Sequence, residues 1–504
     1  MDTLECIRNS LVMDRVFLID PATSRSFSYG QFLQSAAALA EHLRVQGLIS
    51  GDRLAILLKN SPEFAATYFA CLYLGIAAVP INPALHHSEI EFILKNSGAK
   101  FLLLSPETEP LLARSSIPKL RLSRLEELPS GARSWESLEG FSEKDIFSIV
   151  FTSGTTGQPK AVCHKIKGLI RNAALFNEIH GIGPQNRFYH ILPMSYTAGF
   201  FNLLLSPFLA GSSVVLSDGI SSKLALEFWH IPVRYEVNTL WLVPTVVSML
   251  LKVDRDEEGL EYCQKKITHA FIGTAPLPLQ TRRKFQSRYG TTLLESYGLS
   301  ETLFVTTNSR GRKIREDSVG HPLDGIEIKI KDESGCDLHT GQEGEIFIKT
   351  PDLMAGYLDY QSLKTAPAPT QEFSSGDIGL LGNSGELYIT GRKKDLIIRG
   401  GIKVSSQAIE NVLAKLSVVE EVIVVGIPHE IQGEEIVVAI QFKLGYNLRS
   451  QQDQLVSYCQ ENFSALSQPT RFVEIDKLPL GLTGKIQKKK IREMLIKNAL
   501  GVST

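Results

Sequence analysis

The chain has little of several features that mark specialised classes of protein. Its six cysteines are scattered, without the paired spacing of a zinc site or a disulfide framework. The formal net charge of -1 gives no global field that would attract nucleic acid or an anionic membrane. No uninterrupted apolar run reaches the length of a membrane span. The opening MDTLECIRNS has acidic and polar residues where a secretory signal needs an apolar run, so we predict a cytoplasmic protein.

What is present indicates a globular protein with more than one domain. Hydrophobic residues make up 43% of the chain and charged residues 21%, and 504 residues exceed the size of one ordinary core. Near the amino terminus, apolar segments over 51–58 and 75–80 read as strands. Helical patterns begin after Phe27, at Asn60-Ser61-Pro62 and at Ser88. Strands that alternate with helices predict parallel α/β sheet layers.

The segment 151–160 (FTSGTTGQPK) has the composition of a loop that binds phosphate. Its glycines let the backbone approach an anion, and amides, hydroxyls and a lysine can then hold phosphate oxygens. An apolar strand over 146–150 precedes it, and a helical pattern over 167–179 follows. Turns rich in Ser, Thr and Gly are also common as plain connections, but the flanking strand and Pro159-Lys160 favour the phosphate loop. It is not a Walker loop, because no Gly-Lys-Ser/Thr follows Gly154 at the required spacing.

This loop resembles the signature of the adenylate-forming superfamily, which includes acyl-CoA synthetases, firefly luciferases and the adenylation domains of peptide synthetases. Four further segments fit the same pattern in order: 295–302 (ESYGLSET), 375–379 (SGDIG), 388–395 (YITGRKKD) and 478–486 (LPLGLTGKI). The resemblance extends from about Phe27 to Arg492 and is strongest to acyl-CoA synthetases. It implies an α/β fold: a large amino-terminal domain, residues 1–394, of stacked α/β subdomains with a small β subdomain near 320–348, and a small mobile α+β carboxy-terminal domain, residues 395–504.

The resemblance implies roles in adenylation for individual residues. Lys485 would contact the acyl carboxylate and the α-phosphate, while Glu301 and Thr155 would hold Mg²⁺. The expected ATP and AMP contacts are Thr152, Ser153, Gly154, Thr155, Thr156, Gly157, Lys160, Gly273, Thr274, Ala275, Ser296, Tyr297, Gly298, Ser300, Asp377 and Arg392. Tyr297 would pack on adenine, and Asp377 with Arg392 would hold the ribose. The plainer alternative is that an exposed glutamate, or a lysine in a basic stretch, is only solvated.

The chemistry of the implied reaction accounts for these residue types. A carboxylate attacks the α-phosphorus of ATP, so positive charge is needed where negative charge accumulates. No general base is required, because a carboxylic acid is already ionised at neutral pH. The expected products of this step are an acyl-adenylate and pyrophosphate.

The segment 191–199 (ILPMSYTAG) resembles the one that closes the acyl pocket, with Tyr196 at the position of a histidine. Tyr196 could equally be a half-buried core aromatic. Thr197 stands where domains for α-amino acids carry an aspartate, which argues against an amino-acid substrate. The expected pocket residues are Tyr196, Phe200, Trp241, Val243, Thr274 and Phe304. This largely apolar set predicts an aliphatic or aromatic acid.

A second half reaction would move the acyl group to a thiol after the small domain rotates about a hinge at Asp395. Gly400, Gly401, Lys403 and Arg471 are the residues expected near that thiol. We predict an enzyme that uses ATP, Mg²⁺ and CoA, an AMP-forming acid–thiol ligase. Only Arg471 is basic in the segment 466–471, so the phosphopantetheine arm of an acyl carrier protein is the alternative acceptor. A luciferase-like oxygenase and a non-catalytic homologue are the other interpretations, and a homodimer is one assembly to consider.

Overall fold

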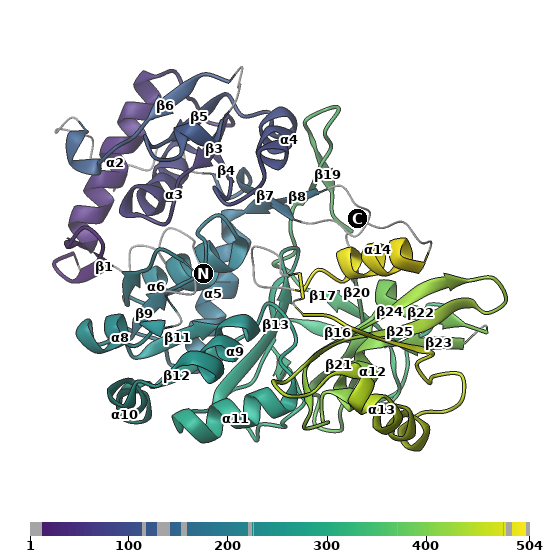
Figure 1. The fold of residues 1–504 in the computed structure, drawn as a ribbon. Coiled ribbons are helices and arrows are strands. Elements are labelled where there is room, and N and C mark those ends of the chain that lie inside the picture. The colour runs from purple at the N-terminus through teal and green to yellow at the C-terminus, as the bar shows by residue number, and fades with distance from the viewer. Residues whose placement is uncertain are drawn as a thin grey trace.

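The computed structural model describes residues 13–112, 117–128, 142–152, 159–219, 224, 226–369, 371–400, 402–476, 478–479 and 486–499. In these residues the strands form sheets of nine, eight, four and five strands. The two largest sheets belong to the amino-terminal part of the chain, and the five-stranded sheet belongs to the carboxy-terminal part beside it (Figure 1). The predicted α/β architecture, with a large first domain and a smaller second one, is confirmed.

The nine-stranded sheet is parallel through its centre and antiparallel at both ends. Its order is β15 (His321–Pro322), β14 (Leu303–Thr307), β13 (Leu293–Leu299), β12 (His269–Ile272), β11 (Thr239–Leu242), β9 (Arg187–His190), β10 (Ser213–Leu216), β1 (Val16–Asp20) and β2 (Arg25–Ser28). Strands β13, β12, β11, β9, β10 and β1 are parallel. The helices that follow or precede these strands are α2 (Tyr29–Val45), α5 (Ile166–His180), η3 (Ala198–Leu205), α6 (Ser206–Leu209), α8 (His230–Arg234), α9 (Pro244–Val253), α10 (Glu257–Lys266) and α11 (Leu279–Tyr289).

The eight-stranded sheet contains the strands on either side of the expected phosphate loop. Its order is β19 (Thr365–Pro367), β18 (Gly356–Leu358), β8 (Lys160–Lys165), β7 (Ile146–Thr152), β4 (Ala77–Pro80), β3 (Arg53–Leu57), β5 (Phe101–Leu104) and β6 (Lys119–Arg121). The short helices α3 (Pro62–Leu74), α4 (His87–Ser97), η1 (Glu109–Leu111) and η2 (Leu125–Glu127) connect its strands. Ser61 caps α3, as its Ser-Pro start predicts, by accepting a hydrogen bond from the backbone N–H of Phe64.

Strand β8 corrects the expected order of strand, loop and helix. It pairs antiparallel with β7, with Thr152 opposite Lys160. The predicted loop therefore connects the two strands of a hairpin, and Lys160 begins a strand that precedes α5. Anion binding by this loop would rely on its own amides and hydroxyls, since no helix begins at its end.

Alternate residues of β3 divide the core of the large domain into two layers. Leu54 and Ile56 belong to a cluster that also contains residues of α2, α3, α5 and the nine-stranded sheet. Ala55 and Leu57 face the opposite side, where they pack with α4 residues such as Ile90. This division follows from the alternation of side chains along a strand. The first of these two clusters contains residues of both large sheets and so joins them into one body.

A small sheet and the carboxy-terminal domain complete the fold. The four-stranded sheet has the order β16 (Glu327–Lys331), β17 (Gly344–Lys349), β20 (Phe373–Leu381) and β21 (Leu387–Arg392), and η4 (Lys393–Asp395) follows it. The five-stranded sheet contains β23 (Ile402–Ser405), β22 (Leu396–Arg399), β25 (Gly433–Phe442), β24 (Val419–His429) and β26 (Arg471–Glu474). Residues of α12 (Ser406–Leu413) and α13 (Leu448–Asn462) pack on one face of the latter sheet, and residues of α14 (Lys488–Ala499) pack on the other.

Two expectations for the β-rich region are wrong in detail. The segment 320–325 does not belong to the small sheet, because His321 and Pro322 pair with β14 at the end of the nine-stranded sheet. The proline-rich segment 365–370 would most simply be a surface connection from its sequence, but its first residues form β19 and pair with β18.

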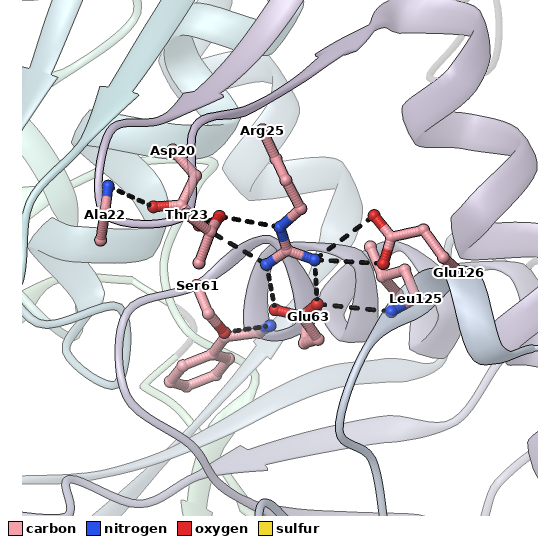
Figure 2. Close-up of polar contacts among 9 residues, drawn as sticks. Asp20, Ala22, Thr23, Arg25, Ser61, Glu63, Leu125 and Glu126 are labelled. Carbon is pink, nitrogen blue, oxygen red and sulfur yellow. Dashed lines mark hydrogen bonds and ion pairs between the residues drawn. The ribbon is translucent and has the colours of Figure 1, made fainter.

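A partly buried arginine links the edge of the nine-stranded sheet to the start of α3 (Figure 2). Arg25 Nη1 lies 2.7 Å from Glu63 Oε1 and 3.2 Å from Glu126 Oε2, and Nη2 lies 3.5 Å from Asp20 Oδ2. Glu63 Oε1 also accepts a hydrogen bond from the backbone N–H of Leu125. The cluster fixes β2 against α3 and η2, and therefore one sheet against the other.

Few polar contacts hold the carboxy-terminal domain against the large domain. Lys252 Nζ lies 2.5 Å from Glu420 Oε1, and Gln280 Nε2 donates to the Lys415 carbonyl at 3.3 Å. Lys403 pairs with Glu333 of the large domain. Exposed pairs of this kind each contribute only about 0 to 1 kcal/mol. Within the part of the chain that the structure describes, no helix is both long and apolar enough to cross a bilayer.

Candidate active site

The predicted site residues follow the carboxyl ends of the parallel strands in the nine-stranded sheet. Val243 follows β11, Gly273 and Thr274 follow β12, and Ser300 follows β13. In open α/β sheets, ligands bind outside the carboxyl ends of the strands. The structure therefore brings these sequence-distant segments to one edge, as the motifs require.

The two predicted ribose contacts form one cluster with Tyr297. Asp377 Oδ1 lies 2.8 Å from Arg392 Nε, and Asp377 Oδ2 accepts a hydrogen bond from the Tyr297 hydroxyl at 2.8 Å. Asp377 is 2% exposed, and burial followed by the Asp377 charge raises the pKa of Tyr297 well above its usual value. An ionised carboxylate has about four acceptor sites, so Asp377 can still receive ribose hydroxyls. Packing of the Tyr297 ring on adenine remains a prediction.

Tyr357 contacts both Glu301 and Lys160. The Tyr357 hydroxyl donates to Glu301 Oε1 at 2.7 Å, and Lys160 Nζ lies 4.8 Å from the centre of the Tyr357 ring. Burial and the Glu301 charge raise the pKa of Tyr357, so its hydroxyl remains a donor at neutral pH. Tyr357 orients the carboxylate that would bind the metal, and it holds a cation nearby.

The carboxylate of Glu301 fits the Mg²⁺ that the family resemblance implies. Among the described contacts its second oxygen, Oε2, has no protein partner. No group of three or more His, Cys, Asp or Glu side chains in the described ranges forms a preformed metal site. Mg²⁺ in nucleotide sites is commonly held by one or two carboxylates together with substrate phosphates. Glu301 would thus hold the ion jointly with ATP.

The ends of the phosphate loop are fixed by aromatic contacts. Tyr360 donates its hydroxyl to the Pro159 carbonyl, and its ring stacks on Phe151 at 6.0 Å. Thr152 Oγ1 donates to the Lys160 carbonyl at 3.3 Å. The loop residues Ser153, Gly154, Thr155, Thr156 and Gly157 lie outside the described residues, as do Lys485 and Gly401. Their predicted roles remain predictions.

Among the remaining residues predicted to contact the nucleotide, some present their backbone and others lie in the core. His164 Nε2 bonds to the Ser300 carbonyl at 2.6 Å, which fixes the residue before Glu301. The Ser296 hydroxyl bonds to Thr307 Oγ1 at 2.9 Å, so its backbone rather than its side chain faces Gly273. A Cβ at Gly298 would lie 1.9 Å from the Leu303 carbonyl oxygen, so this turn requires glycine. Ala275 is half-buried after Thr274.

The aromatic residues predicted to line the acyl pocket form two groups. Trp241 and Phe304 stack at 5.2 Å, whereas Phe200 stacks on Tyr68 at 4.1 Å. The half-buried Tyr196 accepts a hydrogen bond on its hydroxyl from Asn82 Nδ2 at 2.9 Å. Val243 is buried before α9.

Two of the residues predicted to lie near the thiol, Gly400 and Lys403, lie in and after one turn of the small domain. Gly400 has φ +56°, and its N–H donates to the Gln432 carbonyl at 2.8 Å. Arg399 Nη1 donates to the Gln468 carbonyl at 2.6 Å, which joins this turn to the segment before Arg471. Arg471 Nη2 lies 3.4 Å from Glu435 Oε1. The structure thus brings Gly400 close to the segment that precedes Arg471, and Lys403 lies on the strand after this turn.

Three residues with positioning contacts were not assigned roles from the sequence. They are Tyr357, His164 and Asn82. The sequence offered a signal for two of them, because Gly356-Tyr357 and the segment 79–83 (VPINP), which contains Asn82, also resemble the family pattern. Their partners are distant in sequence, so their roles required the structure.

Replacing Tyr357 by phenylalanine should weaken metal binding without removing the ring beneath Lys160. We expect the Mg²⁺ concentration for half-maximal adenylation to rise about tenfold or more, because residues that orient a ligand typically change metal affinity by that factor. Mn²⁺ binding with ATP, followed by electron paramagnetic resonance, measures the affinity directly. Tyr388→Phe is the matched control, because it loses a similar bond to Glu386 on the small sheet. Unchanged Mn²⁺ affinity in Tyr357→Phe would contradict the assignment.

Three buried histidines should make the large domain sensitive to acid. Burial lowers the pKa of His164 and His190 to about 4 and that of His180 to about 3, from 6.5. The unfolded chain therefore takes up protons at a higher pH than the folded chain, so stability is lost as pH falls below 6.5 toward 4. Each pKa unit of difference between the folded and unfolded states changes the free energy of unfolding by about 1.4 kcal/mol. Urea unfolding at a series of pH values tests this prediction. His164→Asn should reduce the slope of the free energy of unfolding against pH, and a free energy that does not change over this range would refute the prediction.

Comparison with known proteins places the chain by fold and then by family. The ATP-bound crystal structure of MatB from Rhodopseudomonas palustris has a TM-score of 0.86 at 24% identity, covering 99% of this chain and 100% of that one. This likeness establishes that the chain shares the fold of MatB. The model for the AMP-binding enzyme family matches residues 8–358, and that for the AMP-binding enzyme C-terminal domain matches residues 408–485. The protein belongs to the AMP-binding enzyme family.

Relatives with named activities cover nearly the whole chain. The sulfoacetate–CoA ligase of Cupriavidus necator is 27% identical over 505 residues, 97% of this chain and 96% of its own. The o-succinylbenzoate CoA synthetase of Bacillus subtilis, in complex with the acyl-adenylate intermediate OSB-AMP, is 27% identical with a TM-score of 0.82, covering 97% of each chain.

Proposed function

We propose that this protein joins a carboxylic acid to CoA in two steps, with ATP as the source of energy. The first step forms an acyl-adenylate and releases pyrophosphate, and the second moves the acyl group to the CoA thiol. The observation that carries the proposal is the grouping of Glu301, Tyr357 and Lys160 in a member of the AMP-binding enzyme family. Both relatives described above are named as CoA ligases or synthetases.

The described residues have distinct tasks in the first step. Asp377 and Arg392 hold the ribose, and Lys160 contributes positive charge beside the phosphates. Glu301, oriented by Tyr357, binds Mg²⁺, which neutralises phosphate charge when it is bound. Lys485 supplies the cation between the acyl carboxylate and the α-phosphate. The acid needs no general base, because its carboxylate is already ionised.

The second step requires a different arrangement of the carboxy-terminal domain, residues 395–504, about Asp395. The weak polar contacts between the domains support such a movement. Gly400 leaves room for a pantetheine arm at the turn, with Gly401, Lys403 and Arg471 nearby. CoA is the acceptor that we propose. A carrier protein is the less favoured acceptor, because both relatives described above are named as CoA ligases or synthetases.

Pyrophosphate exchange with a panel of carboxylic acids tests the first step, and mass spectrometry of acyl-CoA tests the second. We expect acid-dependent exchange without oxygen, followed by saturable thioester formation at sub-millimolar CoA. Exchange without transfer to CoA, beside rapid loading of a phosphopantetheinylated carrier, would reassign the acceptor. Absence of exchange with any acid would refute the proposed activity. Light scattering on the same preparation tests the homodimer, and fractionation of cells tests the cytoplasmic location.

A further inference from the structure

Trp241 carries a buried hydrogen-bond donor that has no partner in the described part of the chain. The side chain is 2% exposed, and its Nε1 atom makes no hydrogen bond. A buried donor left without a partner has lost its hydrogen bonds to water without replacement, which is unfavourable. Trp229 shows the usual arrangement, because its Nε1 donates to Asp254 Oδ2 at 3.2 Å. The indole N–H of Trp241 is therefore a candidate group for binding a ligand.

The indole edge that carries this donor lies beside Gly273, which follows β12 at the edge of the sheet where the acyl group is expected. A Cβ at Gly273 would lie 3.8 Å from Trp241 Cζ2, on the Nε1 side of the ring. Phe271 and Phe304 each stack on the indole at 5.2 Å and fix its orientation. A donor held in this way loses little freedom when it binds an acceptor.

The next residue along the chain, Thr274, has a second unmatched polar atom. Thr274 Oγ1 is buried without a hydrogen-bond partner among the described residues. Its backbone has φ +71°, in the left-handed region that β-branched residues rarely adopt. Strain of this kind persists where the surrounding structure imposes it, and it concentrates at ligand sites. Gly273, which lies against the indole, directly precedes this threonine.

The surroundings of Trp241 indicate the charge of the group that these atoms would bind. The rings in contact with the indole belong to Phe176, Phe271 and Phe304, and none of them carries charge. A second carboxylate or a sulfonate buried here would need a cation as partner. A neutral oxygen needs only hydrogen bonds, which an N–H and a hydroxyl supply.

We infer that the acid carries a neutral ketone or hydroxyl oxygen on its acyl part, bound by Trp241 Nε1 and Thr274 Oγ1. The inference rests on the proposed function and narrows its substrate class. The apolar pocket residues alone predict a plain aliphatic or aromatic acid. Mostly apolar walls with a few placed polar groups are the usual way in which a pocket selects one ligand.

Pyrophosphate exchange with matched pairs of acids tests the inference. The pairs are hexanoate against its keto derivatives, and phenylpropanoate against its ring-hydroxylated derivatives. For the wild-type protein we expect one oxygenated acid to exceed its parent in kcat/KM by about tenfold or more, the value of one or two neutral hydrogen bonds. Trp241→Phe and Thr274→Val keep the ring and the β-branch, and each should reduce that ratio about tenfold.

The ratio between paired acids separates specificity from general damage. Any loss of ATP binding in Thr274→Val affects both acids of a pair equally. Trp229→Phe is the matched control, because it removes a buried indole N–H whose partner is Asp254, and its ratio should equal that of wild type. Exchange with the parent acids but no preference for an oxygenated one, or a preference unchanged in Trp241→Phe, would overturn the inference. Exchange with no acid at all would instead refute the proposed function.

Discussion

Replacing Lys485 by alanine should reduce pyrophosphate exchange by about a hundred- to a thousandfold, the usual effect of removing one preorganised electrostatic contact. The reaction brings a carboxylate and the α-phosphate together, and we propose that Lys485 of the Gly-Lys segment supplies the cation between them. The start of α14, three residues after Lys485, is held within the small domain, where Lys488 Nζ lies 2.7 Å from Glu410 Oε1.

The second half reaction provides the test of specificity for Lys485→Ala. Transfer from a supplied acyl-adenylate to CoA should be largely spared, because the lysine acts only in the first step. Lys497→Ala is the matched control, since it removes an exposed lysine from α14. Normal exchange in Lys485→Ala would show that this lysine is ordinary surface.

Local signals were sufficient for most elements of the large domain. Ser61-Pro62 predicts the start of α3, because a hydroxyl cap and a proline at the first helical position are both encoded within a few residues. Strand β8 was missed because Ala161, Val162 and Cys163 are all buried, so the strand lacks the alternation that marks a half-buried strand. Strands β15 and β19 are short and owe their formation to partners that are distant in sequence.

Two separate motifs predicted that Asp377 and Arg392 would lie in one site. The structure brings these two side chains within 2.8 Å of one another, while their roles toward the ribose remain proposals. The bond between Glu301 and Tyr357 joins residues 56 positions apart, which no local pattern encodes. Trp241 was expected as an apolar wall, and its unmatched donor appears only when its neighbours are known.

The proposed hinge at Asp395 would determine whether one active site can serve both half reactions. It closes η4, directly before β22 of the small domain. In the present arrangement Ser405 Oγ donates to the Thr390 carbonyl at 2.9 Å, and Lys252 pairs with Glu420 across the domains. The ion pair contributes only about 0 to 1 kcal/mol, whereas the Ser405 bond is partly buried, and rotation of the small domain has to break both.

Asp395→Pro should therefore permit adenylation and block thioester formation. Proline fixes φ and restricts the preceding residue, so the link would be held near one arrangement. We expect pyrophosphate exchange near the wild-type rate and a loss of acyl-CoA formation of about a hundredfold or more, because the thiol site cannot be assembled. Asp395→Ala is the control, since it removes the carboxylate but leaves the backbone free, and it should retain both activities. If both half reactions fell together in Asp395→Pro, the substitution would be damaging the fold. If neither fell, the domains would turn at another residue.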